Sequence, residues 1–264
     1  MILSSKPKSK LYISYFLTYT LHMYLSVIIP AYNEERRIST TLDHIAKYLS
    51  RQSYDWEIIV VNNGSTDGTG TLVKNRQKEI SNLRLIESQK GKGYAVRRGM
   101  LEANGELRLY MDADNSTTIE HIELMLPYFK KGYSVVIGSL TEPGAKIVSV
   151  GEETLWRAPL AKLGSKWIQI FAVWGIKDTQ RGFKMYTARA AEDIYSRLTI
   201  LGWGVDIEVL AIARTRGYKI GEIPVTWNNG PDSKVTVWTY VQCLLETLQV
   251  FRNRLLGVYK KDKS

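Results

Sequence analysis

The sequence has one cysteine, Cys243, which excludes an intrachain disulfide and gives no indication of a zinc site. It also lacks a run of about 20 apolar residues, the length that a membrane-spanning helix needs, and this excludes an integral protein with several spans. The apolar stretch at residues 11–25 is short for such a helix and lacks a small-residue cleavage pattern. We therefore expect residues 1–24 to form an interfacial or packing segment.

Several absent motifs exclude other classes of nucleotide-using protein. The glycines at 91 and 93 match the spacing of neither a dinucleotide-binding fingerprint nor a P-loop. A sugar-1-phosphate nucleotidyltransferase normally opens with a Gly-Gly-x-Gly-Thr-Arg-like loop, which is missing here. A processive polysaccharide synthase would carry a Gln-x-x-Arg-Trp motif and several spanning helices, and the sequence has neither.

The composition is that of a globular enzyme-sized domain. The chain has 264 residues, of which 44% are hydrophobic and 23% charged, enough for one substantial core. Its formal charge of +10 favours anionic partners such as nucleotides or phospholipids, although charge of this size also serves solubility alone. We expect one α/β catalytic domain over residues 25–235.

Strand-like and helix-like patterns alternate along the first half of the chain. The predicted strands are residues 26–29, 57–61, 83–86, 106–111 and 134–137. The predicted helices between them are residues 36–49, 69–80, 94–103 and 119–129. This alternation predicts a Rossmann-like, mostly parallel central sheet flanked by helices. Ligands of such sheets bind at the carboxyl ends of the strands, so the loops that follow the strands are the candidate site.

Three of these loops have residues suited to a nucleotide. After the first strand, Tyr32 is expected to lie against a base and Glu34 to accept hydrogen bonds, although a helix-initiating turn is the alternative and both can hold together. A turn-rich loop with glycines that allow close backbone approach follows the second strand at residues 62–69. Lysines and free N–H groups at residues 90–94, before a helix, suit phosphate.

The most specific local feature is Asp112-Ala113-Asp114, at the end of the fourth predicted strand. Carboxylates two residues apart point to the same side of an extended chain. Such oxygen ligands suit one divalent ion, Mg²⁺ or Mn²⁺, which bridges two phosphate groups. An isolated Asp-x-Asp is more often a helix-capping pattern, but its position at a strand's carboxyl end favours the metal.

These motifs together resemble those of a family 2 glycosyltransferase of the GT-A fold, in the segments VIIPAYNE, VVNNGSTDGT, KGKGYAVRRG and DAD. In the second half, DTQRGFK at residues 178–184 resembles the DTQ-x-GFK stretch of dolichyl-phosphate β-glucosyltransferases and their polyprenyl-phosphate relatives. Residues 204–208, 223–227 and 233–234 are also similar to that group. The resemblance implies an inverting transfer of a hexose, best matched by glucose from UDP-glucose, to a polyprenyl or dolichyl phosphate.

The resemblance and the strand-end loops give two sets of expected site residues. The expected catalytic residues are Asp112, Asp114, Asp178, Lys184 and Lys234, with Asp112 and Asp114 as the metal ligands. The expected nucleotide-binding residues are Pro30, Ala31, Tyr32, Glu34, Asn62, Asn63, Lys92, Asp112, Ala113 and Arg157. A lipid phosphate, unlike a hydroxyl, needs cations rather than a base, and Arg157, Lys184 and Lys234 would supply them. Asp178 or Asp206 would be the base for a hydroxyl acceptor; alternatively, Asp178 caps a turn and Asp206 starts a helix.

Three departures from the family pattern leave the donor open. The family usually has Asp-Asp where this chain has Asn62 and Asn63, and an amide can still hydrogen-bond a uracil edge. Leu140 replaces an Arg common in close relatives, and Arg181 stands where the glucosyltransferases commonly have Cys. The alternatives are a GDP-mannose-dependent polyprenyl-phosphate mannosyltransferase and a family 2 transferase that acts on a glycan hydroxyl.

The end of the chain, residues 236–264, predicts an amphipathic helix with a basic tail. Its apolar positions recur every three or four residues, with aromatic residues near the start and Lys and Arg at the end. This pattern suits a helix on an anionic membrane surface, with the protein peripheral at the cytoplasmic face. A helix packed on the catalytic domain or on a second subunit, as in a homodimer, is the alternative. We expect no nucleic-acid partner; the non-enzyme alternative is a membrane-associated nucleotide-binding module.

Overall fold

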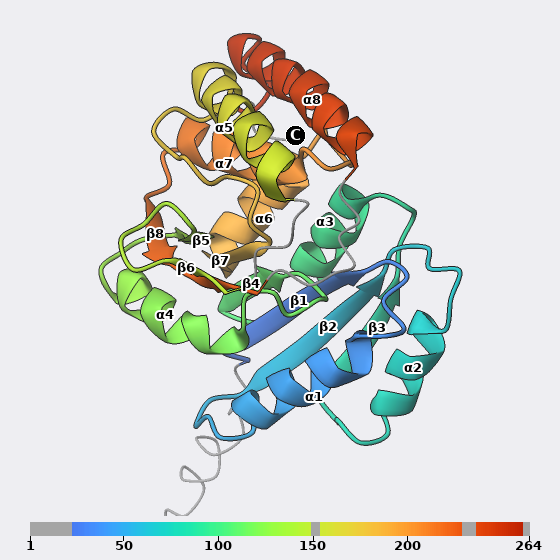
Figure 1. Ribbon diagram of the computed structural model, residues 1–264. Helices are drawn as coiled ribbons and strands as arrows, with labels where there is room; N and C mark the ends of the chain where they lie inside the picture. Colours follow the sequence, from blue (N-terminus) through green and yellow to red (C-terminus); the bar gives the residue numbers. More distant parts are fainter. Residues whose placement is uncertain (1–22, 149–153, 229–235, 261–264) are drawn as a thin grey trace, which may run out of the picture.

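The computed structural model describes residues 23–148, 154–228 and 236–260 (Figure 1). A seven-stranded sheet runs through its centre, and a two-stranded sheet lies beside it. The strands of the large sheet are β1 (Leu25–Ala31), β2 (Trp56–Asn62), β3 (Leu83–Glu87), β4 (Leu107–Met111), β5 (Val135–Ser139), β7 (Phe183–Thr187) and β8 (Ile220–Pro224). The short strands β6 (Lys146–Ile147) and β9 (Thr226–Trp227) form the small sheet.

The large sheet has the strand order β3-β2-β1-β4-β7-β5-β8. All neighbours pair in parallel except β7, which is antiparallel to both β4 and β5. The amino end of β7 therefore lies at the same edge as the carboxyl ends of the other six strands. This edge collects loops from both halves of the chain.

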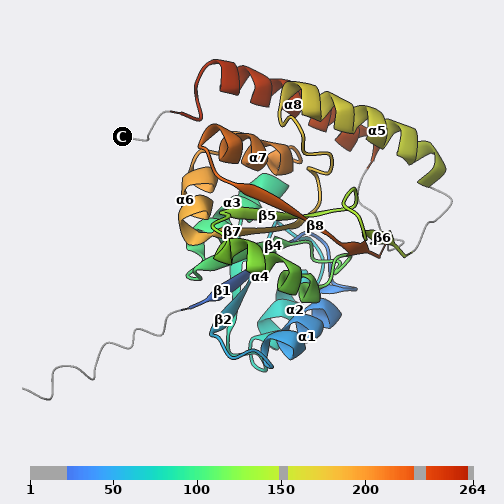
Figure 2. The same cartoon turned by 90° about the vertical axis from the view of Figure 1, so that its left-hand side faces the viewer.

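Helices cover both faces of the sheet (Figures 1 and 2). They are α1 (Ile38–Leu49), α2 (Thr69–Arg76), α3 (Lys92–Glu102), a 3₁₀ turn (Ile119–His121) that leads into α4 (Ile122–Lys130), α5 (Thr154–Phe171), α6 (Ala188–Ser196), α7 (Val205–Thr215) and α8 (Val237–Leu255). No helix among the described residues is both long and apolar enough to span a membrane.

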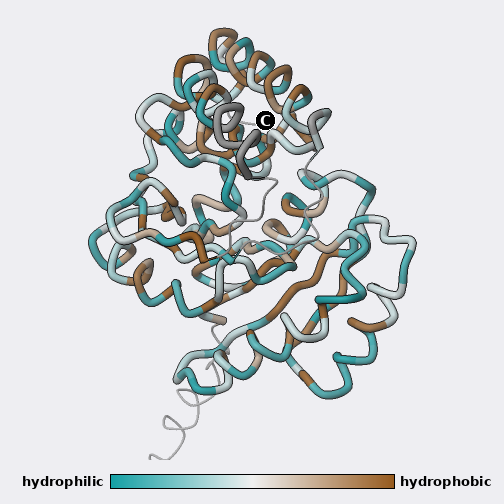
Figure 3. Tube along the Cα trace, in the orientation of Figure 1, coloured by the Kyte–Doolittle hydropathy of each residue, from teal (hydrophilic) through white to brown (hydrophobic). Residues whose placement is uncertain are grey.

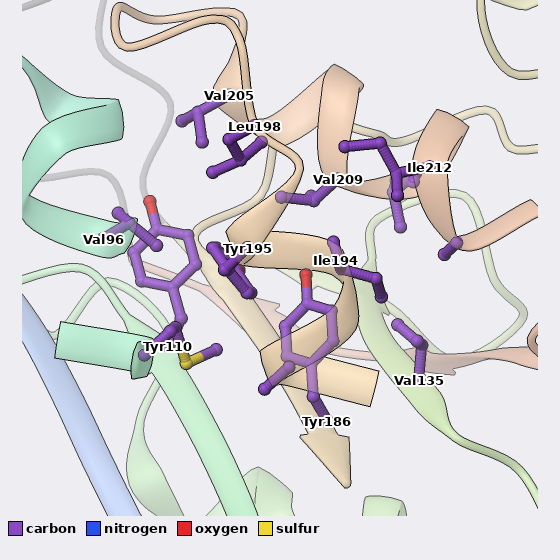
Figure 4. Packing of buried hydrophobic residues seen from close by; sticks show 14 of the residues in the cluster. Val96, Tyr110, Val135, Tyr186, Ile194, Tyr195, Leu198, Val205, Val209 and Ile212 are labelled. Carbon is purple, nitrogen blue, oxygen red and sulfur yellow. The ribbon is translucent and has the colours of Figure 1, made fainter. Parts of the chain in front are cut away.

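The two faces of the sheet have separate hydrophobic cores. In β1, Val27 and Ile29 belong to the core with α1 and α4, whereas Ile28 belongs to the core with α3, α6 and α7. Side chains alternate between the faces of a strand, so a strand that is covered on both sides is apolar throughout. Figure 3 shows this as brown segments along the central strands. Figure 4 shows the second core, where Tyr110 of β4 and Tyr186 of β7 lie beneath α6 and α7.

The predicted mostly parallel sheet flanked by helices is confirmed, and so is the C-terminal helix. The helix predicted at residues 69–80 ends earlier, at Arg76, because i to i−3 hydrogen bonds from Lys78 and Glu79 replace the helical pattern. The antiparallel strand β7 was missed, since residues 183 and 184 had been interpreted only as part of a motif.

Helix α8 packs its polar side inward. Its buried residues are Thr239, Cys243, Thr247 and Val250, and it lies against α5 and α7. Most of the predicted apolar stripe points outward, with Val241, Leu244, Leu245, Leu248 and Leu255 exposed. Most of the apolar side of α8 therefore faces away from the rest of the protein, unlike that of a helix that packs its apolar side on the core.

Candidate active site

The site edge of the sheet places Asp112, which follows β4, directly beside Gly182, which precedes β7. The Asp112 N–H donates to the Gly182 carbonyl at 3.0 Å. A Cβ added at Gly182 would lie 2.1 Å from Oδ2 of Asp112, far inside van der Waals contact. A side chain here would force the Asp112 carboxylate to move, because the carboxylate occupies that space.

The Asp112-Ala113-Asp114 loop is fixed from several sides. The Tyr110 hydroxyl donates to Oδ1 of Asp112 at 3.2 Å, and the Thr41 hydroxyl donates to the Ala113 carbonyl at 2.9 Å. Oδ1 of Asp114 accepts from the Ser116 N–H at 2.9 Å. The Asp112 side chain remains 42% exposed, so this oxygen donor set is open to a ligand.

Two lysines and a second aspartate complete a charge cluster with Asp112. Nζ of Lys92 lies 3.6 Å from Oδ1 of Asp112 and 3.0 Å from Oδ2 of Asp206. Lys184 donates from its Nζ to the other oxygen of Asp206 and to the Arg181 carbonyl. Asp206 thus holds one lysine from α3 and one from β7.

The surroundings shift the pKa of three of these groups. Desolvation raises the pKa of Asp112, against the opposing charge of Lys92. Desolvation lowers the pKa of Lys184, although Asp206 opposes this shift. For Lys92, desolvation is outweighed by Asp112 and Asp206, and its pKa is raised, so this lysine stays charged beside the two carboxylates.

The predicted nucleotide loops after β1 and β2 lie together. The Asn63 N–H donates to the Ala31 carbonyl at 2.8 Å, and Oδ1 of Asn63 accepts from the Gly91 N–H at 2.7 Å. Nζ of Lys90 lies 4.8 Å from the centre of the Tyr32 ring. Asn63 therefore joins the loop after β1 to the phosphate-type loop before α3.

Asn62 and Glu34 have partners within the protein. Nδ2 of Asn62 donates to Glu87 at 2.8 Å, and Oδ1 of Asn62 accepts from the Ser65 N–H at 3.2 Å. Glu34 accepts from Nε of Arg37 at 2.7 Å. Both side chains are largely buried, and their contacts in this structure hold the two loops in place. Pro30 lies in β1, next to its end.

The loop before α3 packs on the loop that contains Leu201. Gly91 has φ +142°, and a Cβ there would lie 2.6 Å from the Leu201 carbonyl oxygen. The Gly93 N–H donates to that oxygen at 3.1 Å. The glycines at 91 and 93 thus allow contact with a distant segment of the second half, as well as close approach to a ligand.

Of the predicted catalytic residues in the second half, Asp178 lies in a loop at the same edge. Its Oδ2 accepts from the Leu140 N–H at 2.8 Å and from Nε of Arg181 at 3.1 Å. This position fits the alternative of a loop-organising residue. Lys234 lies outside the described residues, and Arg157 lies in α5 with its side chain outside them.

Two residues that shape the surroundings of Asp112, namely Asp206 and Gly182, are not assigned these roles by the sequence. Asp206 does lie in the first turn of α7, but its carboxylate binds Lys92 and Lys184 and caps nothing. Gly182 had been interpreted only as part of a motif. The available signal for Asp206 was a pair of acidic residues, Asp206 and Glu208, that alternate with apolar residues in the run Val205–Leu210.

Comparisons with known proteins give the family of the chain. The family model of Glycosyl transferase family 2 matches residues 26–194. A dolichyl-phosphate beta-glucosyltransferase of Trichomonas vaginalis is 35% identical over 90% of this chain and 76% of that protein. The Homo sapiens protein of the same name is 29% identical, over 91% of this chain and 78% of its own length.

Solved structures share the fold at low sequence identity. Glucosyl-3-phosphoglycerate synthase from Mycobacterium tuberculosis, in complex with Mn²⁺ and UDP-glucose, has a TM-score of 0.61 at 19% identity, covering 92% of this chain and 81% of its own. Mannosyl-3-phosphoglycerate synthase from Rubrobacter xylanophilus has a TM-score of 0.59 at 16% identity, covering 92% and 77%. The chain therefore belongs to glycosyl transferase family 2: it is a glycosyltransferase with the GT-A fold, grouped by sequence with the dolichyl-phosphate beta-glucosyltransferases.

Proposed function

We propose that this chain transfers glucose from UDP-glucose to dolichyl phosphate, with inversion, at a membrane surface. The observation that carries the proposal is the charge cluster at the site edge, where Asp112 lies between Lys92 on one side and the loop before β7 on the other. A diphosphate leaving group and a phosphate acceptor are both negatively charged, and cations beside the acidic pair Asp112 and Asp114 can offset this charge. The relatives reported above are named as enzymes that transfer glucose to dolichyl phosphate.

The acidic pair fits a divalent ion that also binds the donor. Among the described residues no group of three or more His, Cys, Asp or Glu side chains could hold a metal. Asp112 and Asp114 would therefore hold Mg²⁺ or Mn²⁺ together with oxygens of the donor's diphosphate. Such an ion supplies positive charge that offsets the negative charge growing on the departing UDP.

The reaction balances without a base. An oxygen of the acceptor phosphate forms a bond to C1 of the glucose, the bond from C1 to the β-phosphate oxygen breaks, and its electron pair leaves with UDP. A phosphate monoester, with a second pKa of about 6, already carries the necessary charge at neutral pH. The task of the protein is to hold two anions close together, and Lys92 lies where it can offset the charge of the donor.

The membrane part of the proposal rests on an outer apolar face formed by α5 and α8. These helices pack on each other, as Figures 1 and 2 both show. Trp174 and Trp238 are 71% and 72% exposed. The other members are Leu163, Ile170, Val241, Leu244, Leu245, Leu248, Leu255 and Leu256. Ten exposed apolar side chains on a strongly basic chain favour an anionic lipid surface as the partner of this face.

The helix α8, which forms part of this face, also contacts loops at the site edge. Gln180, in the loop before β7, donates to Sγ of Cys243 at 3.3 Å, and Glu246 of α8 accepts from the Gly204 N–H. The inner side of α8 thus contacts loops of the site, while its outer side is apolar. A lipid whose chain stays in the membrane would present its phosphate near these loops.

The transfer is tested by incubating the protein with radiolabelled UDP-glucose, GDP-mannose or UDP-N-acetylhexosamines and dolichyl phosphate, and by counting the label extracted into organic solvent. We expect label from UDP-glucose only. Label from GDP-mannose alone would favour the mannosyltransferase, and transfer only to a glycan hydroxyl would refute the lipid acceptor.

The metal role is tested with Asp114→Ala, for which we expect at least a 1,000-fold loss of transfer, or roughly 4 kcal/mol of transition-state stabilisation. The thermal midpoint should change little, because Asp114 lies outside both cores. Asp43→Ala, an exposed carboxylate of α1, is the matched control. Full transfer by the Asp114 variant, or by the wild type in excess chelator, would contradict the role.

Membrane binding is tested by sedimentation with phosphatidylserine-containing vesicles. The double variant Trp238→Glu and Leu245→Glu should lose most binding, whereas Leu124→Glu, at an exposed leucine of α4, should keep it. Unchanged binding of the double variant would refute the lipid surface. A dimer of the wild type in light scattering that the double variant abolishes would instead assign this face to a second copy.

A further inference from the structure

The lysine expected to contact the acceptor phosphate cannot reach it. Lys184 is 0% exposed, and its Nζ is engaged by the Asp206 carboxylate and the Arg181 carbonyl. A phosphate that contacted this lysine would have to displace a buried carboxylate. Lys184 therefore serves the cluster and fixes the backbone of Arg181.

Arg181 is the cation of this segment that reaches the surface. Its side chain is 27% exposed. The guanidinium lies 4.5 Å from the centre of the Trp227 ring, and its Nε donates to Asp178 at 3.1 Å. Among the described residues no hydrogen bond engages its two terminal nitrogens. The contacts with Asp178 and Trp227 hold the guanidinium in place, and the N–H groups of its two terminal nitrogens can donate hydrogen bonds to a ligand.

Three contacts fix this geometry before any ligand binds. The Arg181 backbone is held by Lys184, its Nε by Asp178, and its plane by Trp227 of β9. Asp178 is itself held by the Leu140 N–H after β5. A guanidinium fixed in this way loses little conformational entropy when it binds an anion.

The position of Arg181 relative to the metal pair defines which anion it meets. It directly precedes Gly182, whose carbonyl accepts from the Asp112 N–H and whose missing side chain leaves room for the Asp112 carboxylate. The donor loops with Tyr32, Asn63 and Lys92 lie on the β1, β2 and α3 side of Asp112, whereas Trp227 and Leu140 follow β8 and β5 on the other side. The nucleotide and the guanidinium therefore flank the acidic pair from opposite sides.

We propose that Arg181 binds the phosphate monoester of the acceptor. The inference rests on the proposed function, whose acceptor is a lipid phosphate. A planar guanidinium donates two parallel N–H bonds to phosphate oxygens, which an ammonium cannot do. Arg181 also offsets repulsion between the acceptor and the donor's diphosphate.

The test measures binding of farnesyl phosphate, a short soluble analogue, to the UDP-saturated wild type, Arg181→Gln and Arg181→Lys. We expect the Kd of farnesyl phosphate to rise at least tenfold in Arg181→Gln, with partial recovery in Arg181→Lys. The Kd of UDP and the thermal midpoint should stay unchanged. The acceptor KM should rise with little change in the KM for UDP-glucose. Arg98→Gln, which removes an arginine paired with Glu102 at 2.9 Å on α3, is the matched control.

Each outcome decides the inference. An unchanged Kd of farnesyl phosphate in Arg181→Gln overturns it, and so does an equal loss of UDP binding. If Arg181→Gln is unstable, two other variants replace it in the test. Trp227→Leu and Asp178→Asn each keep Arg181 but remove one contact of its guanidinium, and each must raise the Kd of farnesyl phosphate.

Two further ligands separate this inference from the proposed function. Farnesol, which has no phosphate, should bind the wild type and Arg181→Gln alike. Glycerol 3-phosphate, a phosphate monoester without a lipid, should bind weakly. Tight, Arg181-dependent binding of glycerol 3-phosphate would keep the role of Arg181 and refute the lipid acceptor.

Discussion

The proposed donor side and the proposed acceptor side of the site are built in different ways. On the donor side, backbone groups and amides join loops that each follow one strand, as in the contacts of Asn63 with Ala31 and Gly91. On the acceptor side, charged side chains meet groups from separate segments, as in the contacts of Lys184 with Asp206 and of Arg181 with Trp227. The donor-side loops can be recognised from local sequence motifs, whereas the acceptor-side contacts can be recognised only in the folded chain.

Asp206 joins the two sides, and its loss should have the largest effect. Asp206→Asn leaves the buried Lys184 without its carboxylate, and we expect a loss of roughly 3–5 kcal/mol in the free energy of unfolding. Urea denaturation measures it. Asp43→Asn, which breaks an exposed pair with Arg76, should cost less than about 1 kcal/mol. Equal effects would show that the two sides are not joined through this cluster.

Gly182 tests how tightly the acceptor side packs on the metal pair. Gly182→Ala forces a methyl group against the Asp112 carboxylate, and transfer should fall at least 100-fold, or about 2.7 kcal/mol. Single-turnover transfer measures this fall. Gly164→Ala on α5, where a Cβ meets nothing within 4 Å, is the control. A fully active Gly182 variant would mean that the β7 loop can move away from Asp112 freely.

Asn62 tests whether the donor side depends on its amides. Asn62→Asp places a carboxylate 2.8 Å from Glu87, and we expect a loss of roughly 1 kcal/mol in the free energy of unfolding. Adding Glu87→Gln should restore most of it, whereas the exposed control Asn82→Asp should change little. If the double variant is no better than the single one, the contact with Glu87 is not what selects an amide here.

Cys243 offers the smallest perturbation, because it reports on α8 without changing the charge. Burial raises the pKa of its thiol to about 12. At pH 8 the thiolate should be about 1,000-fold scarcer than for a thiol of pKa 9, and iodoacetamide should react correspondingly slowly with the folded protein. Reaction in urea provides the reference. Equal rates in the folded and unfolded protein would show that α8 leaves the site loops readily.

The same contrast explains how much the sequence could predict. The parallel strands and the place of Asp112 and of the glycine-rich loops at strand ends were predictable, because periodicity and turn chemistry are local signals. Three features could not be predicted: the burial of Lys184, the ion pairs of Asp206 with two lysines, and the stacking of Arg181 on Trp227. Each depends on contacts between segments 20 or more residues apart. The period of the helix at 237–255 was recognised, but which side packs inward depends on the partners supplied by α5 and α7.

The outer apolar face formed by α5 and α8 also governs how the molecule behaves in buffer. Two exposed tryptophans and a row of exposed leucines favour self-association, whereas a formal charge of +10 opposes it through repulsion between molecules. Salt screens that repulsion. The colloidal stability of the purified protein should therefore fall as ionic strength rises, and a mild detergent that covers this side should restore it.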